Sequence, residues 1–189
     1  MENSIGTTIF HGTTFSQEEL NSIEAALKKI SLDKGSILLG EGEIVLNQYF
    51  VTSGCLRTYF IDNSGKEHTL QFAIKDWWIS DYTAFFSGTK SIMSIECIQD
   101  AIVYKLPRKR MEQLYIDIPK FETFFRIKLE KAFAAFQKRT LGNLALTAKE
   151  RYLYFISAYP NIEQNVKNYH IASYLGITTE SLSRIRKTL

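Results

Sequence analysis

The chain has 189 residues, of which 45% are hydrophobic, 13% aromatic and 23% charged, and its formal net charge is +3. This composition excludes a disordered chain and suits one large domain or two small ones. Two cysteines, Cys55 and Cys97, are too few for a disulfide framework or for a four-cysteine zinc or iron–sulfur site. Residues 1–8 lack the pattern of a secretory signal, and no apolar run is long enough for a membrane span. We therefore expect a cytoplasmic protein that needs no metal and no cofactor.

The charge is distributed unevenly along the chain. Residues 1–119 contain 11 basic and 15 acidic side chains, a net charge of −4, whereas residues 120–189 contain 12 and 5, a net charge of +7. A basic C-terminal third next to an acidic N-terminal part indicates two modules with different partners. Charge alone fits a solvated helix face equally well, so the sequence pattern has to decide between the two interpretations.

The N-terminal part has the pattern of a β-roll that follows a short helix. Ser16 and Glu19 form a capping box, and the apolar periodicity after it predicts a helix over residues 17–29. Short β-rich runs then alternate with turn residues, among them Asn63, Ser64 and Gly65 in a predicted hairpin. The predicted strands cover residues 36–39, 48–53, 55–61, 67–72, 92–97 and 102–106. Strands of this length and spacing indicate an antiparallel roll or jelly roll.

A long helix is predicted to start at Pro119, which is well placed in a first helical turn. Four of its residues are spaced by 4, 3 and 4 positions, which is the spacing of a seam between two paired helices. This predicted dimer seam consists of Phe125, Leu129, Ala132 and Phe136. A single contact with the roll would leave much of the apolar surface of such a helix in water, so we expect a homodimer.

Residues 168–189 fit a helix-turn-helix, and the helix before them opens with a second capping box at Thr147 and Glu150. Its two helices are predicted over residues 169–175 and 179–189, with Gly176 at the turn. Polar side chains at the start and on the outer face of the second helix can hydrogen-bond base edges or phosphates in a major groove. They are Thr178, Thr179, Glu180, Ser181, Ser183, Arg184 and Lys187. The alternative is an ordinary helical hairpin, and the basic surroundings favour DNA binding.

The whole arrangement resembles the Crp/Fnr family of bacterial transcription regulators. The most specific stretch is IASYLGITTESLSRIRK, residues 171–187. The turns of the roll are similar too, at Lys34-Gly35, Gly42-Glu43, Ser53-Gly54, Gly65-Lys66-Glu67 and Asp76. The resemblance implies an α+β fold with an N-terminal antiparallel, jelly-roll-like β-roll of the cyclic-nucleotide-binding type, a long dimerisation helix and a small C-terminal helix-turn-helix domain. We place these parts in residues 1–118, 119–146 and 147–189.

The resemblance also implies that Glu180 and Arg184 contact bases. Many members of the family have an arginine directly before this glutamate, whereas this chain has Thr179, so its operator preference should differ.

The effector site departs further from that family. Members that bind cyclic AMP carry Gly-Glu at the start of a short helix and, later in the chain, Arg-Ser or Arg-Thr, which holds the cyclic phosphate. The resemblance places Ser80 and Asp81 at the first pair and Lys90 and Ser91 at the second. Lysine lacks the planar fork with which arginine grips a phosphate. We expect an effector site at Asp81, Tyr82, Lys90 and Ser91 that does not bind cyclic AMP tightly.

Three classes of function remain open at this stage. The leading hypothesis is a homodimeric regulator that reads an inverted-repeat operator in double-stranded DNA, with an unknown small-molecule effector and RNA polymerase as further candidate partners. The second is a sensor that acts through protein contacts and has a degenerate helix-turn-helix. The third, a cupin-like metal enzyme, needs clustered ligands, and the roll offers only His11 and His68, so we expect that the protein is not an enzyme. Because the sequence ends at Leu189, we expect fewer phosphate contacts than a winged domain would make.

Overall fold

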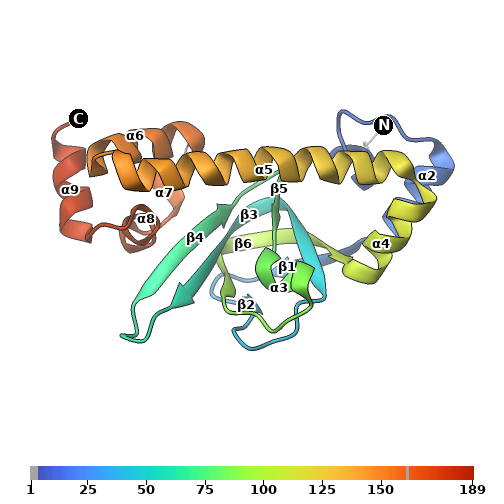
Figure 1. Cartoon of the computed structure of the whole chain (residues 1–189), viewed down its shortest axis with the longest axis horizontal. Coiled ribbons are helices and arrows are strands. Elements are labelled where there is room, and N and C mark those ends of the chain that lie inside the picture. The colour runs from blue at the N-terminus through green and yellow to red at the C-terminus, as the bar shows by residue number, and fades with distance from the viewer. Residues whose placement is uncertain (1–3, 161) are drawn as a thin grey trace. The chain divides into compact units, whose positions relative to one another are not determined.

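The computed structural model describes residues 4–160 and 162–189, and Figure 1 shows its helices and strands along the chain. Residues 1–3 lie outside the described residues. They belong to the segment 1–8, which by its sequence lacks the pattern of a secretory signal. Contacts group the chain into two compact units. The first contains the residues up to 58 and residues 72–130, and the second contains residues 59–71 and 131–189.

The first unit is built on a β-roll. Within the described residues the sheet has six strands, ordered β1-β6-β3-β4, with β2 paired to β6 and β5 paired to β3. The strands are β1 (Lys28–Leu32), β2 (Ile37–Leu39), β3 (Asn47–Ile61), β4 (Glu67–Ala73), β5 (Trp77–Ile79) and β6 (Ser94–Pro107). β1 and β2 pair antiparallel with β6, and β5 pairs antiparallel with β3. The predicted α+β class with an antiparallel roll is confirmed.

Two strands of the roll are longer than the sequence predicted. β3 and β6 are continuous, where breaks after residues 53 and 97 were expected. Gly54 lies inside β3 with a φ of 84°, and a Cβ atom built there would lie 2.3 Å from the carbonyl oxygen of Asp100. Gly54 therefore marks a close approach of two backbones within the sheet and not the end of a strand.

Two short helices, α1 (Ile5–Ile9) and α2 (Gln17–Ala25), precede the roll. The predicted capping box is confirmed, since Ser16 Oγ accepts from the Glu19 amide and the Glu19 carboxylate accepts from the Ser16 amide at 2.6 Å. The predicted end of this helix at residue 29 is wrong, because residues from Lys28 onward pair with β6 as β1. Here strand pairing overrides a local helical periodicity.

Three helices complete the first unit: α3 (Tyr82–Ser87), α4 (Arg108–Asp117) and the N-terminal part of α5 (Pro119–Ala145), which starts at Pro119 as predicted. Phe121, Phe124 and Phe125 of α5 are buried in the core of the roll. The ring centroid of Phe125 lies 5.0 Å from that of Trp78, and only 5% of Phe125 is exposed. The assignment of Phe125 to the dimer seam is therefore wrong, because its side chain packs inside its own protomer.

The second unit contains the C-terminal part of α5, the helices α6 (Ala148–Ala158), α7 (Ile162–Asn165), α8 (Asn168–Leu175) and α9 (Thr179–Lys187), and the end of the β3–β4 hairpin. The second capping box is confirmed, since Thr147 Oγ1 accepts from the Glu150 amide at 3.3 Å and Glu150 accepts from the Thr147 amide at 2.8 Å. The hairpin residues 59–71 group with the C-terminal helices, whereas the sequence-based limits placed them in the roll. Among the described residues, no helix is both long and apolar enough to cross a membrane.

Candidate functional site

The two helices predicted as a helix-turn-helix are α8 and α9. α8 ends at Gly176, whose φ of 66° and ψ of 34° are left-handed and cost a glycine little. The Ile177 amide donates to the Ala172 carbonyl at 3.0 Å, which closes the turn. Thr178 then caps α9 by accepting a hydrogen bond from the Ser181 amide at 3.2 Å. The chain changes direction within three residues, and α9 begins at Thr179 as predicted.

The inner faces of α8 and α9 form a small core. Ile171 and Leu182 are fully buried, and Leu175 is buried as well. Phe155 of α6 is buried beside them, with its ring centroid 5.2 Å from that of Tyr174. The predicted inner face is confirmed at these positions, and Glu180, Ser183 and Arg184 lie on the exposed side of α9.

The predicted DNA-contacting residues lie together at the start and along the outer face of α9. Thr179 and Ser181 are half-buried, and the remaining five are exposed: Thr178, Glu180, Ser183, Arg184 and Lys187. Arg184 Nη2 donates to Ser181 Oγ at 3.2 Å, which is a local contact within the helix. Within the described part of the chain, neither Arg184 nor Lys187 has a salt-bridge partner. Their charges are therefore available to an external acceptor.

Glu180 is held in its ionised form at the start of α9. Its pKa lies below the ordinary value because its own backbone amide donates to the carboxylate, and the hydroxyls of Thr178 and Thr179 add to the effect. The positive end of the helix dipole favours a negative charge in this first turn as well. At neutral pH Glu180 is thus an acceptor that can receive the exocyclic amine of cytosine.

Arg186 is a structural residue of α9 that the sequence interpretation missed. Its guanidinium points inward and donates to Tyr152 Oη at 3.1 Å, to Asn168 Oδ1 at 2.6 Å and to Glu163 Oε1 at 2.8 Å. It therefore ties α9 to α6, α7 and α8. The available signal was its spacing, because Arg186 follows the buried Leu182 by four residues and so shares its helix face.

Asp81, the centre of the predicted effector site, is already bonded within the roll. It is fully buried and caps α3, with Oδ1 accepting from the Ala84 amide at 3.1 Å. Its Oδ2 accepts from Ser91 Oγ at 2.9 Å and from the Ile92 amide at 3.1 Å. The structure brings Asp81 and Ser91 together as predicted. They bond directly to each other, so the groups that were expected to bind an effector are used within the roll.

The other two predicted effector residues do not join them. Lys90 is exposed. The hydroxyl of Tyr82 donates to Gln48 Oε1 at 3.4 Å, and burial raises the pKa of Tyr82 well above its ordinary value. The four residues therefore do not present a shared set of free polar groups. In the described part of the chain, no group of three or more His, Cys, Asp or Glu side chains could hold a metal ion.

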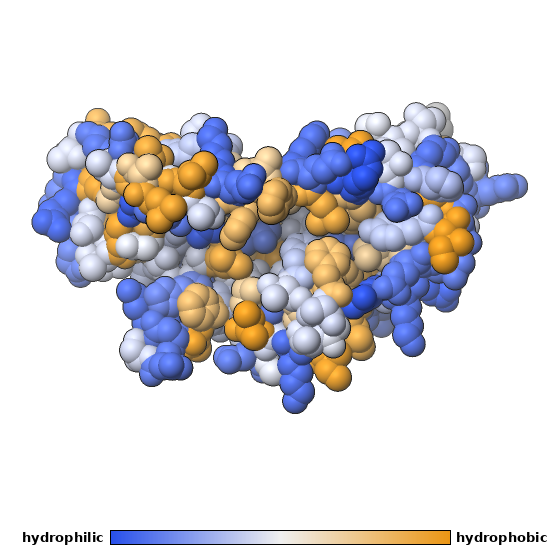
Figure 2. All heavy atoms as spheres, in the orientation of Figure 1, coloured by the Kyte–Doolittle hydropathy of each residue, from blue (hydrophilic) through white to orange (hydrophobic). Residues whose placement is uncertain are grey.

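The remaining members of the predicted dimer seam are at the surface of α5. Leu129 is 41% exposed and Phe136 is 56% exposed, and Ala132 is exposed between them. Phe133, on the same side of the helix, is exposed as well. Figure 2 shows apolar side chains interrupting the charged surface along α5. This strip has the composition of a surface that another apolar surface covers.

Comparisons with known proteins agree with this geometry. Residues 29–117 match the cyclic nucleotide-binding domain family. The chain is 21% identical over 180 residues to the transcriptional activator protein Anr of Pseudomonas protegens, an alignment that covers 89% of this chain and 73% of Anr. Both proteins are similar in sequence over most of their lengths.

Two solved structures are similar in fold. The c-di-GMP-responsive global regulator CLP of Xanthomonas campestris has a TM-score of 0.73 at 13% identity, over 92% of this chain and 91% of that chain. A transcriptional regulator of the Crp/Fnr family from Eubacterium rectale has a TM-score of 0.69 at 19% identity, over 92% of this chain and 83% of that chain. At these identities the likeness concerns the fold, which both proteins share with this chain across the roll and the C-terminal helices.

Proposed function

We propose that this chain, which belongs to the Crp/Fnr family of transcription regulators, binds a specific sequence in double-stranded DNA through α9. The observation that carries the proposal is the outer face of α9, where Glu180, Arg184 and Lys187 are exposed while Leu182 on the opposite face is buried. A helix held in this way by a tight turn and a buried inner face fits the major groove.

The side chains of α9 have different roles in this proposal. Arg184 offers a planar fork that can donate two hydrogen bonds to guanine, and Glu180, one turn earlier, accepts from a cytosine amine. Lys187 lies in the last turn, where a phosphate contact is the more natural role for a flexible point charge. The hydroxyls of Thr178, Thr179, Ser181 and Ser183 supply short hydrogen bonds to the backbone of the duplex or to base edges.

The proposal includes a homodimer that uses the exposed strip on α5. Leu129, Ala132 and Phe136 form its seam, and Phe133 widens it. Two copies related by a twofold axis would read an inverted repeat whose half-site centres lie roughly 34–36 Å apart, one turn of duplex.

We also propose that cyclic AMP is not the effector, and that the protein acts in the cytoplasm. Any effector would have to use groups other than the carboxylate of Asp81, whose two oxygens accept three hydrogen bonds within the roll. RNA polymerase stays a candidate partner of the DNA-bound dimer.

The decisive experiment selects bound duplexes from a random pool and then titrates salt against binding to the selected operator and to a scrambled duplex. Arg184→Ala should lose about 1–3 kcal/mol on the operator and little on the scrambled duplex. Lys187→Ala should weaken both duplexes to a similar extent and lower the salt slope by about one. The two variants are matched controls for each other, because each removes one positive charge from the same helix.

Two results would contradict the proposal. Equal losses on both duplexes for Arg184→Ala would remove this residue from base readout. If the wild-type protein bound no duplex at low salt, the regulator hypothesis would fail, and a sensor that acts through protein contacts would become the better interpretation.

The dimer is tested separately by Leu129→Glu, which places an unpaired charge in the apolar seam and should shift the protein to a monomer at micromolar concentration. Gln137→Glu is the matched control, because it adds the same charge to an exposed position of α5 outside the seam. Sedimentation velocity measures both variants. A wild-type protein that sediments as a monomer at micromolar concentration would refute the dimer.

A further inference from the structure

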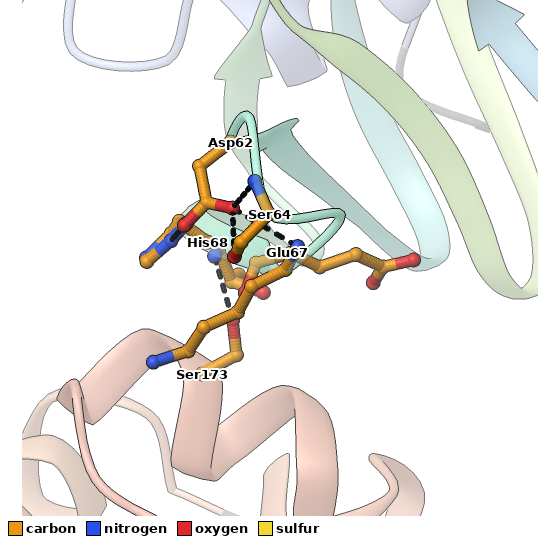
Figure 3. Close-up of polar contacts among 7 residues, drawn as sticks. Asp62, Ser64, Glu67, His68 and Ser173 are labelled. Atoms are coloured by element: carbon orange, nitrogen blue, oxygen red, sulfur yellow. Dashed lines mark hydrogen bonds and ion pairs between the residues drawn. The ribbon is translucent and has the colours of Figure 1, made fainter.

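The end of the β3–β4 hairpin has a turn that is organised by one carboxylate. Asp62 Oδ1 accepts from the Ser64 amide at 2.9 Å, from Ser64 Oγ at 2.6 Å and from the Lys66 amide at 3.1 Å. Its Oδ2 pairs with His68 Nε2 at 2.7 Å. Figure 3 shows these groups converging on Asp62. The turn is therefore a well-defined element and presents the following residues of β4 in a fixed register.

A serine of the helix-turn-helix bonds to the edge of this hairpin. Ser173 Oγ, on α8, donates to the Glu67 carbonyl at 2.8 Å and accepts from the Thr69 amide at 2.8 Å. Glu67 and Thr69 are two residues apart, so their backbone groups point to the same edge of the strand. β4 is the last strand in the sheet order, and its free edge is the place where such groups need partners. A single hydroxyl thus satisfies both of them. Figure 3 shows Ser173 of α8 next to Glu67 of the hairpin.

A second contact from α5 supports the first. The guanidinium of Arg139 lies over the ring of Tyr174, 4.0 Å from its centroid. Arg139 Nη1 donates to the Leu70 carbonyl, and Nη2 lies 3.4 Å from the carbonyl oxygens of Thr69 and Tyr174. The hairpin, α5 and α8 are therefore joined through two adjacent positions of α8, Ser173 and Tyr174.

This contact leaves the outer face of α9 free. Glu180, Arg184 and Lys187 are exposed while Ser173 is bonded to the hairpin. The hairpin therefore does not compete with DNA for the proposed base-reading side chains. What it can do is restrict the orientation of α8, to which α9 is joined by the tight turn at Gly176.

We infer that the hairpin of residues 59–71 is a positioning element of the DNA-binding unit, with Ser173 as the residue through which it holds the helix-turn-helix. The inference rests on the proposed function and extends it by a second structural support besides α5. The hairpin and α8 belong to the same compact unit, and Ser173 bonds to two backbone groups of the hairpin.

The positioning matters most when two recognition helices bind at once. A dimer that reads both halves of an inverted repeat needs two copies of α9 held at a set separation and angle. A helix-turn-helix with more orientational freedom must lose that freedom on binding, which reduces affinity without removing any contact to DNA. A single half-site makes no such demand. The hairpin contact should therefore affect the full operator more than the half-site.

The test uses Ser173→Ala in the full-length protein, with Ser157→Ala, an exposed serine of α6, as the matched control. Amide hydrogen exchange at Thr69 should be faster in Ser173→Ala and unchanged in Ser157→Ala, because only the first removes the acceptor of that amide. Affinity for the full inverted repeat should fall roughly 3- to 10-fold, the size of one or two net hydrogen bonds, and affinity for an isolated half-site should change less than about 2-fold.

Two further variants make the test robust. Ser173→Thr keeps the hydroxyl and should restore both the exchange protection and the preference for the full site. Arg139→Gln weakens the same contact from α5 and should act in the same direction as Ser173→Ala, even if the latter folds poorly.

The outcomes separate this inference from the proposed function. Wild-type protein that binds no duplex refutes the proposed function. Wild-type protein that binds its operator, together with Ser173→Ala and Arg139→Gln that bind the full site as tightly as Ser157→Ala, overturns the positioning role alone. Equal losses on the full site and on the half-site overturn it too, since they indicate damage to the reading face itself.

Discussion

The predicted effector region of the roll and the outer face of α9 each have a carboxylate at the start of a helix. The carboxylate in the roll is buried and hydrogen-bonded, whereas the one on α9 is exposed to water. Asp81 is fully buried, and its two oxygens accept three hydrogen bonds from within the roll. Glu180, also at the start of a helix, is exposed and ionised beside Arg184. A carboxylate whose acceptors are filled stabilises the fold, whereas one that remains in water is free to meet a partner. The comparison separates a carboxylate that stabilises the roll from one that is available to a partner.

The sharpest way to break this comparison is to remove the two carboxylates in turn. Asp81→Ala should lower the free energy of unfolding by about 2–4 kcal/mol, because α3 loses its cap and the amides of Ala84 and Ile92 lose their acceptor. Glu180→Ala should leave the denaturation midpoint close to that of wild type, since its site is exposed. Denaturant titration followed by far-UV circular dichroism measures both. Equal losses for the two variants would mean that burial and bonding do not distinguish the two carboxylates.

Two arginines of α9 extend the comparison to neighbouring positions of one helix. Arg186→Ala should destabilise the second unit by about 1–3 kcal/mol, because it removes a charged donor from three partners in a half-buried site. Arg184→Ala should leave the unfolding free energy within about 0.5 kcal/mol of wild type. Thermal unfolding followed by near-UV circular dichroism reports on the nearby Tyr152. A stable Arg186→Ala that loses DNA affinity instead would place Arg186, and not Arg184, at the DNA.

Local signals in the sequence predicted the parts of this structure that local chemistry determines. Both capping boxes, the start of α5 at Pro119 and the buried Ile171, Leu175 and Leu182 of the helix-turn-helix are confirmed. These features depend on residues within a few positions of each other, where spacing alone gives the face and the boundary.

The features that depend on distant residues were missed or misassigned. Helix α2 ends early because β6, some seventy residues later, pairs with Lys28–Leu32 as β1. Phe125 follows the spacing of a dimer seam, yet the side chains of Trp78 and Phe10 surround it. The bonds from Ser173 to Glu67 and Thr69 span more than 100 residues. Periodicity shows that a residue is covered, but not which segment covers it.

A smaller expected effect is the loss of stability of the β3–β4 hairpin at low pH, where Asp62 becomes protonated. The pKa of Asp62 lies well below its ordinary value because the Ser64 hydroxyl donates to it, with His68 and the Lys66 amide contributing as well. A carboxyl whose pKa is lower in the folded state stabilises the fold above its unfolded pKa, and this stabilisation is lost as the pH falls toward the folded value. The contribution of Asp62 to the hairpin should thus be complete above about pH 4 and be lost as the pH falls below that value.

An NMR titration of the Asp62 carboxyl carbon measures this directly. Ser64→Ala should raise the pKa of Asp62 toward the ordinary value, because it removes the largest cause of the shift. His68→Gln should raise it less. An Asp62 that titrates identically in wild type and Ser64→Ala would show that the turn does not depend on this network.

The smallest expected effect is that of cyclic AMP on the roll. To bind at the predicted effector site, the nucleotide would need to bond to the carboxylate of Asp81 and to place its phosphate at Lys90. Asp81 would have to give up its bonds to Ser91 and Ile92 first, and the Ile92 amide would then lack its acceptor, which costs about 1–3 kcal/mol. Lys90 is exposed and offers a point charge in place of a planar fork. Asp81 is thus a poor partner for cyclic AMP because its oxygens are already bonded, and Lys90 is a poor one because it offers only a point charge.

We therefore expect no heat of binding with cyclic AMP at micromolar protein in calorimetry, and no change in DNA affinity on its addition. Thermal unfolding is an independent measurement, because a ligand at 100 times its dissociation constant would stabilise the folded state by about 2.7 kcal/mol. Ser91→Ala is an informative variant, since it removes one of the two hydrogen bonds that Asp81 Oδ2 accepts and should bind cyclic AMP better than wild type if the filled acceptor is what excludes the nucleotide. If cyclic AMP bound the wild-type protein with a dissociation constant near micromolar, the contrast between Asp81 and Glu180 would be wrong. The buried carboxylate of Asp81 would then be able to exchange its hydrogen-bond partners for a ligand.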